Sequence, residues 1–210
     1  MKLYNADLSP NCLRVRAVAF ELGIELEIVE VSLSSAGSNV ALQAVNPNSK
    51  VPVLVDEDFV LWESRAINNY LCSKRPDRNL LPMEPRARAL VEQWLYWQAI
   101  HLGPAMQTVA YERVIKPKFG LGEPDAAVID AKLKETHKLL PVFDQALGKR
   151  PWIADELSVA DFALASTFMY RKPAELSLAE VPAVSAWIQR VEARDSWRKA
   201  VAPIVERMGL

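Results

Sequence analysis

The spacing of apolar residues changes at Pro76, and this change restricts the possible folds more than any other feature of the sequence. Before Pro76, short apolar runs alternate with stretches of helical spacing, in the order strand, helix, strand, helix, strand, strand, helix. After it, every convincing apolar pattern has the helical spacing, and three prolines (Pro76, Pro82 and Pro85) mark the junction. The sequence therefore predicts an α/β unit with a mixed sheet, followed by an all-helical half.

Local signals predict where these elements begin and end. Ser9 is expected to cap a helix with Pro10 at its first position, and Gly23 to end it. Ser64 is expected to cap a later helix, and Ser158 with Asp161 to form a capping box. In the first half, strands are expected at residues 3–4, 26–31, 51–55 and 59–61, and helices at 10–22, at 40–45 and from Ser64 onward. In the second half, helices are expected at 86–114 (interrupted at Pro104 and closed by Pro117), at 125–147, after Ser158, at 182–193 and at 196–208.

The composition excludes several classes of function. The chain has only 7 Gly and neither G-x-G-x-x-G nor G-x-x-x-x-G-K-[ST], so nucleotide-binding loops lose their main support. Its 25 basic and 26 acidic side chains leave a net charge of −1, which predicts no nucleic-acid or membrane partner. The 2 Cys and 2 His lack the spacing of a zinc site, and no apolar run approaches a membrane span. We expect a metal-free, soluble protein of a reducing compartment.

The first candidate site is the segment Ser9-Pro10-Asn11-Cys12 at the start of the first predicted helix. Unpaired backbone N–H groups and the helix macrodipole stabilise negative charge at such a position. The residues themselves leave two interpretations open. Ser9 either faces an anion or is only an N-cap, worth about 1 kcal/mol, and the segment alone favours the N-cap.

The second candidate site is N-P-N-S-K-V-P-V-L at residues 46–54, where Pro52 stands at the start of an apolar strand. If the Val51–Pro52 bond is cis, the backbone N–H and C=O of Val51 would turn outward to pair with an extended ligand. Since only about 5–6% of X–Pro bonds in folded proteins are cis, the residues alone favour an ordinary trans proline.

The third candidate site is Glu63-Ser64-Arg65 at a predicted helix start. Ser64 and Arg65 together suit a carboxylate, and Glu63 suits an ammonium group. A ligand with both groups side by side is the end of an amino acid. Taken alone, the segment favours a simpler interpretation, an N-cap flanked by two solvated charges.

Taken together, S-P-N-C-x-R-V-R (9–16), N-P-x-x-K-V-P-V-L (46–54), E-S-R-A-I (63–67) and L-S-V-A-D-F-A-L (157–164) resemble the cytosolic glutathione transferase family. The resemblance covers nearly the whole chain, and its serine-type motif is similar to bacterial theta- or nu-like members. It implies a thioredoxin-like α/β domain at residues 1–77, a linker at 78–86 and an all-helical domain at 87–210. It also implies a cytoplasmic detoxification enzyme that forms a two-fold homodimer.

The same resemblance implies glutathione as co-substrate and gives each candidate residue a role. Pro52 would be cis, the Val51 backbone would pair with the cysteinyl part of glutathione, and Lys50 would approach its glycyl end. Glu63, Ser64 and Arg65 would hold the γ-glutamyl end. Ser9 would donate a hydrogen bond to the sulfur and favour the thiolate, which attacks a small apolar electrophile. Asn11 is a second candidate for contact with the sulfur, as in relatives with T-P-N at this position.

The electrophile pocket is expected on the first long helix of the second half. Its lining would come from Trp97, His101, Pro104, Met106 and Tyr111. We assign His101 no acid–base role.

The chain departs from the family pattern in two places. Many relatives carry a basic residue or His where this chain has Gly37-Ser38-Asn39, so no ligand for the glycyl carboxylate is assigned there. The segment S-P-N-C also places Ser9 where a thioredoxin-type C-P-x-C has its first Cys, which leaves Cys12 without an attacking partner. Two other functions remain open: a glutathione-dependent disulfide or peroxide reductase, and a non-catalytic interaction module of the same fold.

Overall fold

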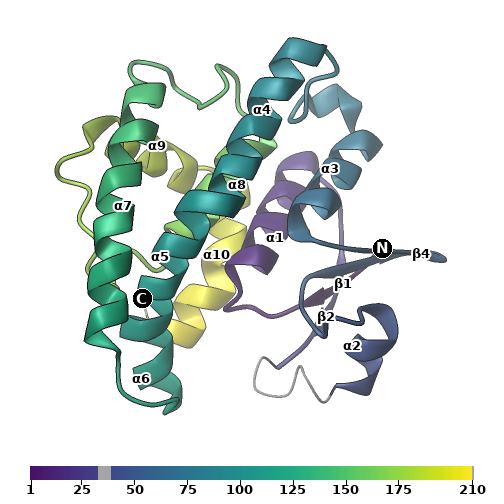
Figure 1. Cartoon of the computed structure of the whole chain (residues 1–210). Helices are drawn as coiled ribbons and strands as arrows, with labels where there is room; N and C mark the ends of the chain where they lie inside the picture. Colours follow the sequence, from purple (N-terminus) through teal and green to yellow (C-terminus); the bar gives the residue numbers. More distant parts are fainter. Residues whose placement is uncertain (33–38, 210) are drawn as a thin grey trace. The chain divides into compact units, whose positions relative to one another are not determined.

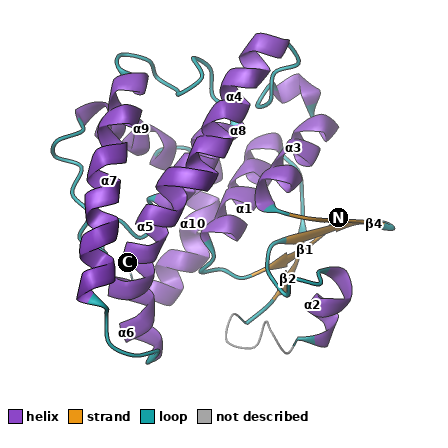
Figure 2. Ribbon diagram, viewed as in Figure 1, coloured by secondary structure: helices purple, strands orange, loops and turns teal. Residues whose placement is uncertain are grey.

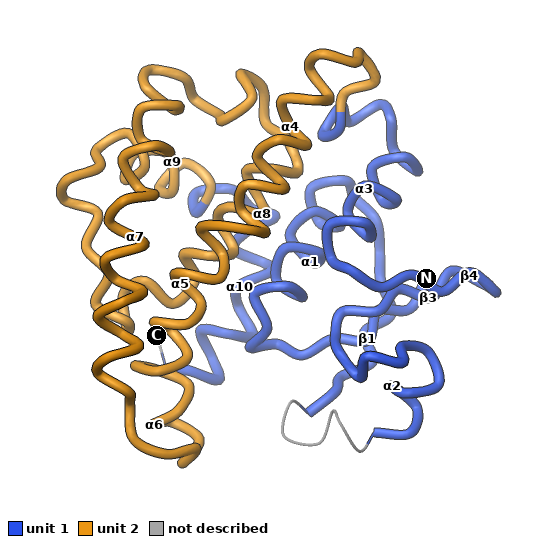
Figure 3. Tube along the Cα trace, in the orientation of Figure 1, with its two compact units in different colours: residues 1–81, 192–210 blue, residues 82–191 orange. Residues whose placement is uncertain are grey.

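A computed structural model describes residues 1–32 and 39–209 of the chain, and these residues form two compact units. Unit 1 contains residues 1–81 together with 192–210, and unit 2 contains residues 82–191 (Figure 3). Within the described residues, no helix is both long and apolar enough to cross a membrane.

Unit 1 is built on a four-stranded mixed sheet, as the sequence predicts (Figure 2). Its strands are β1 (Lys2–Asn5), β2 (Glu27–Glu30), β3 (Val53–Asp56) and β4 (Phe59–Trp62), in the spatial order β2-β1-β3-β4. β1 and β2 are parallel because a helix crosses over between them, and β3 and β4 form an antiparallel hairpin. Glu57 takes the left-handed conformation in the hairpin turn, with φ of 58°.

Three helices accompany the sheet: α1 (Pro10–Leu22), α2 (Val40–Val45) and α3 (Ser64–Lys74), with a short 3₁₀ turn at Pro76–Arg78. α1 begins and ends as predicted, since Ser9 is its N-cap and Gly23 follows it with φ of 67°. The predicted cap of α3 is wrong by one position. Glu63 is the N-cap and Ser64 is the first helical residue, because the chain turns into the helix through a left-handed conformation at Glu63.

The last helix, α10 (Asp195–Met208), belongs to unit 1 and packs against α1 (Figure 1). Side chains of Arg194 and Ser196, at its start, both bond to the carboxylate of Glu21 on α1. The compact units therefore differ from the predicted domains, in which residues 87–210 stay together. Apolar spacing over 196–208 is enough to predict a helix, but it carries no information about the surface that the helix covers.

Unit 2 is all-helical. Its helices are α4 (Pro85–Trp97), α5 (Gly103–Ala110), α6 (Lys116–Phe119), α7 (Ala126–Leu147), α8 (Val159–Thr167) and α9 (Pro182–Glu192), the last of which ends at the boundary with unit 1. Five-residue π-helical turns at Gln98–Leu102 and Tyr111–Ile115 connect α4, α5 and α6.

The predicted interruption at Pro104 is wrong, because the helical path continues through it. In the π-helical turn the N–H of Gly103 bonds to the carbonyl of Gln98, and this wider spacing accommodates a proline at the following position. A Cβ on Gly103 would lie 2.6 Å from that carbonyl, so the turn needs glycine there. Pro117 likewise does not end the helix, which continues to Phe119 and stops at Gly120.

An aromatic cluster around Phe143 fills the core of unit 2. Its ring centroid lies 5.8 Å from that of Trp94 and 4.9 Å from that of Trp187. The predicted capping box at the start of α8 is present, and the carboxylate of Asp161 also accepts the indole N–H of Trp187 at 2.8 Å. This buried carboxylate therefore joins the start of α8 to the aromatic core.

Candidate active site

The sheet register brings the three candidate segments of unit 1 to one end of the sheet. Tyr4 pairs with Val53, and Val53 pairs with Trp62. The chain runs from Tyr4 toward Ser9, reaches Val53 from Pro52, and leaves Trp62 toward Glu63. Because residues paired across neighbouring strands lie side by side, the three segments lie at the same end of the sheet although they are far apart in the sequence.

Ser9 is positioned by the N-terminus of α1. Its N–H donates to the carbonyl of Ala6 at 3.0 Å, and its Oγ accepts the N–H of Cys12 at 3.4 Å. The side chain is nearly buried, with 7% of the residue exposed. Since the cap uses only a lone pair of Oγ, the hydroxyl proton stays available to donate to a ligand. The two interpretations of Ser9 are thus compatible.

Asn11 and Cys12 occupy the first turn of α1 next to this hydroxyl. Asn11 is half-buried, whereas Cys12 is fully buried and accepts the N–H of Ala6 on its Sγ at 3.4 Å. Burial raises the pKa of the Cys12 thiol to about 11, so the thiol stays protonated at neutral pH. A protonated, buried thiol is a poor nucleophile and suits a structural role.

The Val51–Pro52 peptide bond is cis, as the family resemblance implies. The trans bond favoured by the residues alone is therefore wrong. Within the described part of the chain, the backbone N–H and C=O of Val51 have no hydrogen-bond partner. Both groups can therefore pair with an extended ligand. Lys50 is exposed beside them.

Asn46 organises this loop, and the sequence analysis did not single it out. It is 2% exposed, its Nδ2 donates to the carbonyl of Lys50 at 2.7 Å, and its Oδ1 accepts the N–H of Asn48 at 3.0 Å. An Asn directly before a proline is a turn signal that could have identified it.

Glu63, Ser64 and Arg65 lie at the start of α3 with distinct environments. Glu63 is exposed and has φ of 71°, a conformation that non-glycine residues rarely adopt and that is frequent at ligand-binding sites. Ser64 is 4% exposed, and Arg65 is half-buried. Burial lowers the pKa of Arg65, and the nearby Glu63 opposes this effect.

Arg14 is a further functional candidate that the sequence analysis missed. It is fully buried on α1, and its Nη1 donates to the Oγ of Ser64 at 3.3 Å. Burial, followed by the charge of Arg65, lowers the pKa of Arg14 to about 9. Two guanidinium groups beside Ser64 make this helix start favourable for a carboxylate. An Arg between Leu13 and Val15 in an apolar helix was the available signal.

The predicted electrophile residues lie in unit 2, and the structure separates them into two groups. Trp97 is half-buried, while His101, Pro104 and Tyr111 are exposed along one helical path. Met106 is 1% exposed, because its position in the helical period places it on the side that packs into the core of unit 2. Met106 is therefore a core residue rather than part of an accessible lining.

Residues 1–32 and 39–209 contain no group of three or more His, Cys, Asp or Glu side chains that could hold a metal ion. The segment in which no glycyl-carboxylate ligand is assigned includes Gly37 and Ser38, which lie outside the described residues.

Family models match both halves of the chain. Residues 1–73 match the N-terminal domain of glutathione S-transferase, and residues 101–195 match its C-terminal domain. The chain belongs to the glutathione S-transferase family. Glutathione S-transferase 3 of Zea mays is 37% identical, over 97% of this chain and 94% of that protein.

Solved structures of other glutathione S-transferases have the same fold. Glutathione S-transferase I from maize, in complex with an atrazine glutathione conjugate, is 31% identical, with a TM-score of 0.85 over 96% of both chains. A theta-class enzyme from Xanthomonas axonopodis with glutathione bound is 29% identical, with a TM-score of 0.86 over 95% of this chain and 96% of that chain. The bacterial theta- or nu-like type expected from the sequence is not supported, because plant transferases are more identical to this chain.

Proposed function

We propose that this glutathione transferase binds glutathione across the end of the sheet where Ser9, Val51 and Ser64 meet, and forms its thiolate at Ser9. The proposal is carried by the register of Tyr4, Val53 and Trp62, which brings these segments together. A tripeptide in extended conformation would run from the start of α3 past the Val51 backbone toward Lys50, with its cysteine sulfur at the start of α1.

The start of α3 would hold the γ-glutamyl end of glutathione. Its carboxylate would accept from Ser64 and from backbone N–H groups at the helix start, with the charge of Arg65 nearby. Its ammonium would pair with the exposed carboxylate of Glu63. The Val51 backbone would pair with the cysteinyl part, and Lys50 would approach the glycyl carboxylate.

Ser9 would stabilise the thiolate by donating its hydroxyl proton to the sulfur, at a helix start where the macrodipole favours negative charge. A free thiol has a pKa of about 8.5, and lowering it by about two units corresponds to about 2.7 kcal/mol. One charge-assisted hydrogen bond supplies about 1.5–3 kcal/mol, so Ser9 and the helix start together suffice. Asn11 is the second candidate donor.

The thiolate sulfur would then form a bond to the electrophilic carbon of a small apolar substrate, whose leaving group departs with the bonding electron pair. We propose that Trp97, His101, Pro104 and Tyr111 provide the apolar contacts for this substrate. Met106 is left out because it is buried. His101 donates and accepts no proton in this step.

Absorbance of the glutathione thiolate, followed as pH is varied, tests the proposal. We expect Ser9→Ala to move the pKa of bound glutathione most of the way back to the free value, and Ser73→Ala, at an exposed serine of α3, to leave it unchanged. A shift in Asn11→Ala but not in Ser9→Ala would transfer the role to Asn11. No shift in either variant would contradict the proposed site.

We also propose that the protein acts in the cytoplasm as a two-fold homodimer, as is typical of its family. Phe59, Val60 and Trp62 on the edge strand β4 are each more than a third exposed, which supports an association surface in unit 1. Sedimentation at micromolar concentration tests this, and a monomer under those conditions would contradict it.

A further inference from the structure

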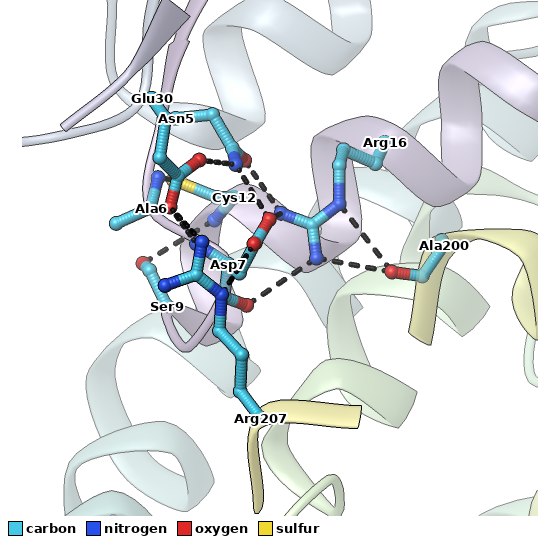
Figure 4. A network of polar contacts seen from close by, with 9 residues as sticks. All are labelled: Asn5, Ala6, Asp7, Ser9, Cys12, Arg16, Glu30, Ala200 and Arg207. Atoms are coloured by element: carbon cyan, nitrogen blue, oxygen red, sulfur yellow. Dashed lines mark hydrogen bonds and ion pairs between the residues drawn. The ribbon is translucent and has the colours of Figure 1, made fainter. Parts of the chain in front are cut away.

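A dense polar network surrounds Asp7, two residues before Ser9 (Figure 4). Oδ1 of Asp7 accepts from Nδ2 of Asn5 at 3.0 Å, and its N–H donates to Oε1 of Glu30 at 3.1 Å. Its carbonyl accepts from Nη2 of Arg16 at 3.3 Å. The backbone and the carboxylate of one loop residue are thus held at the same time.

The C-terminal helix supplies two of the contacts in this network. Nε of Arg207 lies 2.8 Å from Oδ2 of Asp7, and its Nη2 lies 3.5 Å from Oε1 of Glu30. Arg16, which is 5% exposed, donates to the carbonyl of Ala200 through Nη2 at 3.0 Å. α10 therefore reaches the loop directly through Arg207 and indirectly through Arg16.

The loop has little freedom between Asp7 and the hydroxyl of Ser9. The N–H of Ser9 bonds to the carbonyl of Ala6, and the N–H of Ala6 bonds to the Sγ of Cys12. These bonds close a tight turn on the first turn of α1. A displacement of Asp7 is consequently passed to Ser9, since the only residue between them is Leu8.

The arrangement is built differently from an isolated surface ion pair. Asp7 has 14% of its side chain exposed, and it takes part in several charged contacts at once. Arg207 itself has 53% of its side chain exposed, so the difference lies in its partner Asp7. Arg198 on the same helix pairs with Asp195 three positions earlier, and both of these side chains are more than half exposed. Networks with a partly buried member hold their geometry better than exposed pairs do.

We propose that Arg207 is a positioning residue for the reaction: from α10 it holds Asp7, and through Asp7 the loop that aims the Ser9 hydroxyl at the glutathione sulfur. This inference rests on the proposed role of Ser9. It makes the last helix part of the machinery for thiolate formation, through Asp7 rather than through a contact with the ligand.

The test compares Arg207→Gln, Arg207→Lys and the matched control Arg198→Gln with the unaltered protein, each alone and combined with Ser9→Ala. The readouts are the pKa of bound glutathione, from thiolate absorbance, and the pH profile of kcat/KM. We expect Arg207→Gln to raise the thiol pKa by about half a unit, which is about a threefold loss of thiolate below that pKa. KM for glutathione should change less, because Glu63, Ser64 and the Val51 backbone are untouched.

Arg207→Lys, which keeps the positive charge opposite Asp7, should recover most of the shift, and Arg198→Gln should cause none. In the Ser9→Ala background, Arg207→Gln should have no further effect on the thiol pKa, since the two residues act through the same hydroxyl. Equal shifts in both backgrounds, or a lowered Tm without any shift, would overturn the inference. If Ser9→Ala itself has no effect, the proposed role of Ser9 fails first.

Discussion

Replacing Asp161 should destabilise the protein more than any exposed helix cap, because its carboxylate satisfies several buried donors. It accepts from the N–H of Ile153 at 3.1 Å, from the N–H of Ser158 at 3.0 Å and from the indole N–H of Trp187 at 2.8 Å. Asp161 itself is 0% exposed. The hydroxyl of Ser158 also donates to this carboxylate at 3.1 Å, but a hydroxyl can rotate toward another acceptor. In Asp161→Ala the three N–H donors are therefore the groups left without an acceptor at a buried position.

The expected magnitude follows from the count of orphaned donors. Each unsatisfied buried donor costs about 1–3 kcal/mol, so three of them set a range of about 3–9 kcal/mol. Burial raises the pKa of Asp161, although its hydrogen bonds act in the opposite direction, so keeping this carboxylate buried is itself unfavourable. Removing it recovers this desolvation free energy and offsets part of the loss from the unsatisfied donors. We therefore expect a loss of about 3–6 kcal/mol in the free energy of unfolding, a large part of a typical total.

Urea denaturation measures this loss, with Asp125→Ala as the matched control. Asp125 caps α7 with bonds to the N–H groups of Ala127 and Val128, and it is exposed, so water can replace it at a cost of about 1 kcal/mol. Asp161→Asn keeps one acceptor oxygen, so its loss in the free energy of unfolding should fall between those of the other two variants. It can replace Asp161→Ala in the comparison if Asp161→Ala does not fold. A loss in Asp161→Ala no larger than in Asp125→Ala would refute the reasoning.

Two further predictions concern charged groups of unit 1. Glu63→Gln should raise the Kd for glutathione about ten- to a hundredfold, through loss of a charge-assisted bond of about 1.5–3 kcal/mol. Calorimetric titration measures this, with Glu57→Gln, at another exposed residue of positive φ, as the unaffected control. Burial raises the pKa of Glu21, but hydrogen bonds from Arg194 and Ser196 outweigh it and leave the pKa lowered. Ionised Glu21 therefore stabilises the fold fully above the unfolded pKa of about 4.3, and this contribution is lost as pH falls through the folded pKa. Glu21→Gln should lower the free energy of unfolding near neutral pH, and in acid denaturation the difference between the variant and the unaltered protein should shrink as pH falls.

Local chemistry made much of the site predictable. A hydroxyl before a proline at one helix start and charged residues around another can both be recognised within four or five sequence positions. The structure confirms the cap at Ser9, and the cis bond at Pro52 that the family resemblance implies. The roles of Ser9 and Glu63 toward glutathione remain predictions.

The errors have a common physical origin in longer-range geometry. Pro104 interrupts an ideal α-helix, but a π-helical turn absorbs it, and that turn depends on Gly103 fitting against Gln98. Met106 has the apolar character of a pocket residue, yet its angular position in the helix turns it toward the core. Arg14 is charged, and only its burial beside Ser64 makes it part of the site.

The sequence by itself determined the order of the elements, the mixed sheet and the chemistry gathered in three short segments, because apolar spacing, caps and turn residues act over a few neighbouring positions. Only the tertiary structure decided that α10 packs against α1 and that Arg207 reaches Asp7, 200 positions earlier in the chain. Contacts of this kind arise from which apolar faces are left to cover once the local elements have formed. The local sequence pattern of either segment does not predict its contact with the other.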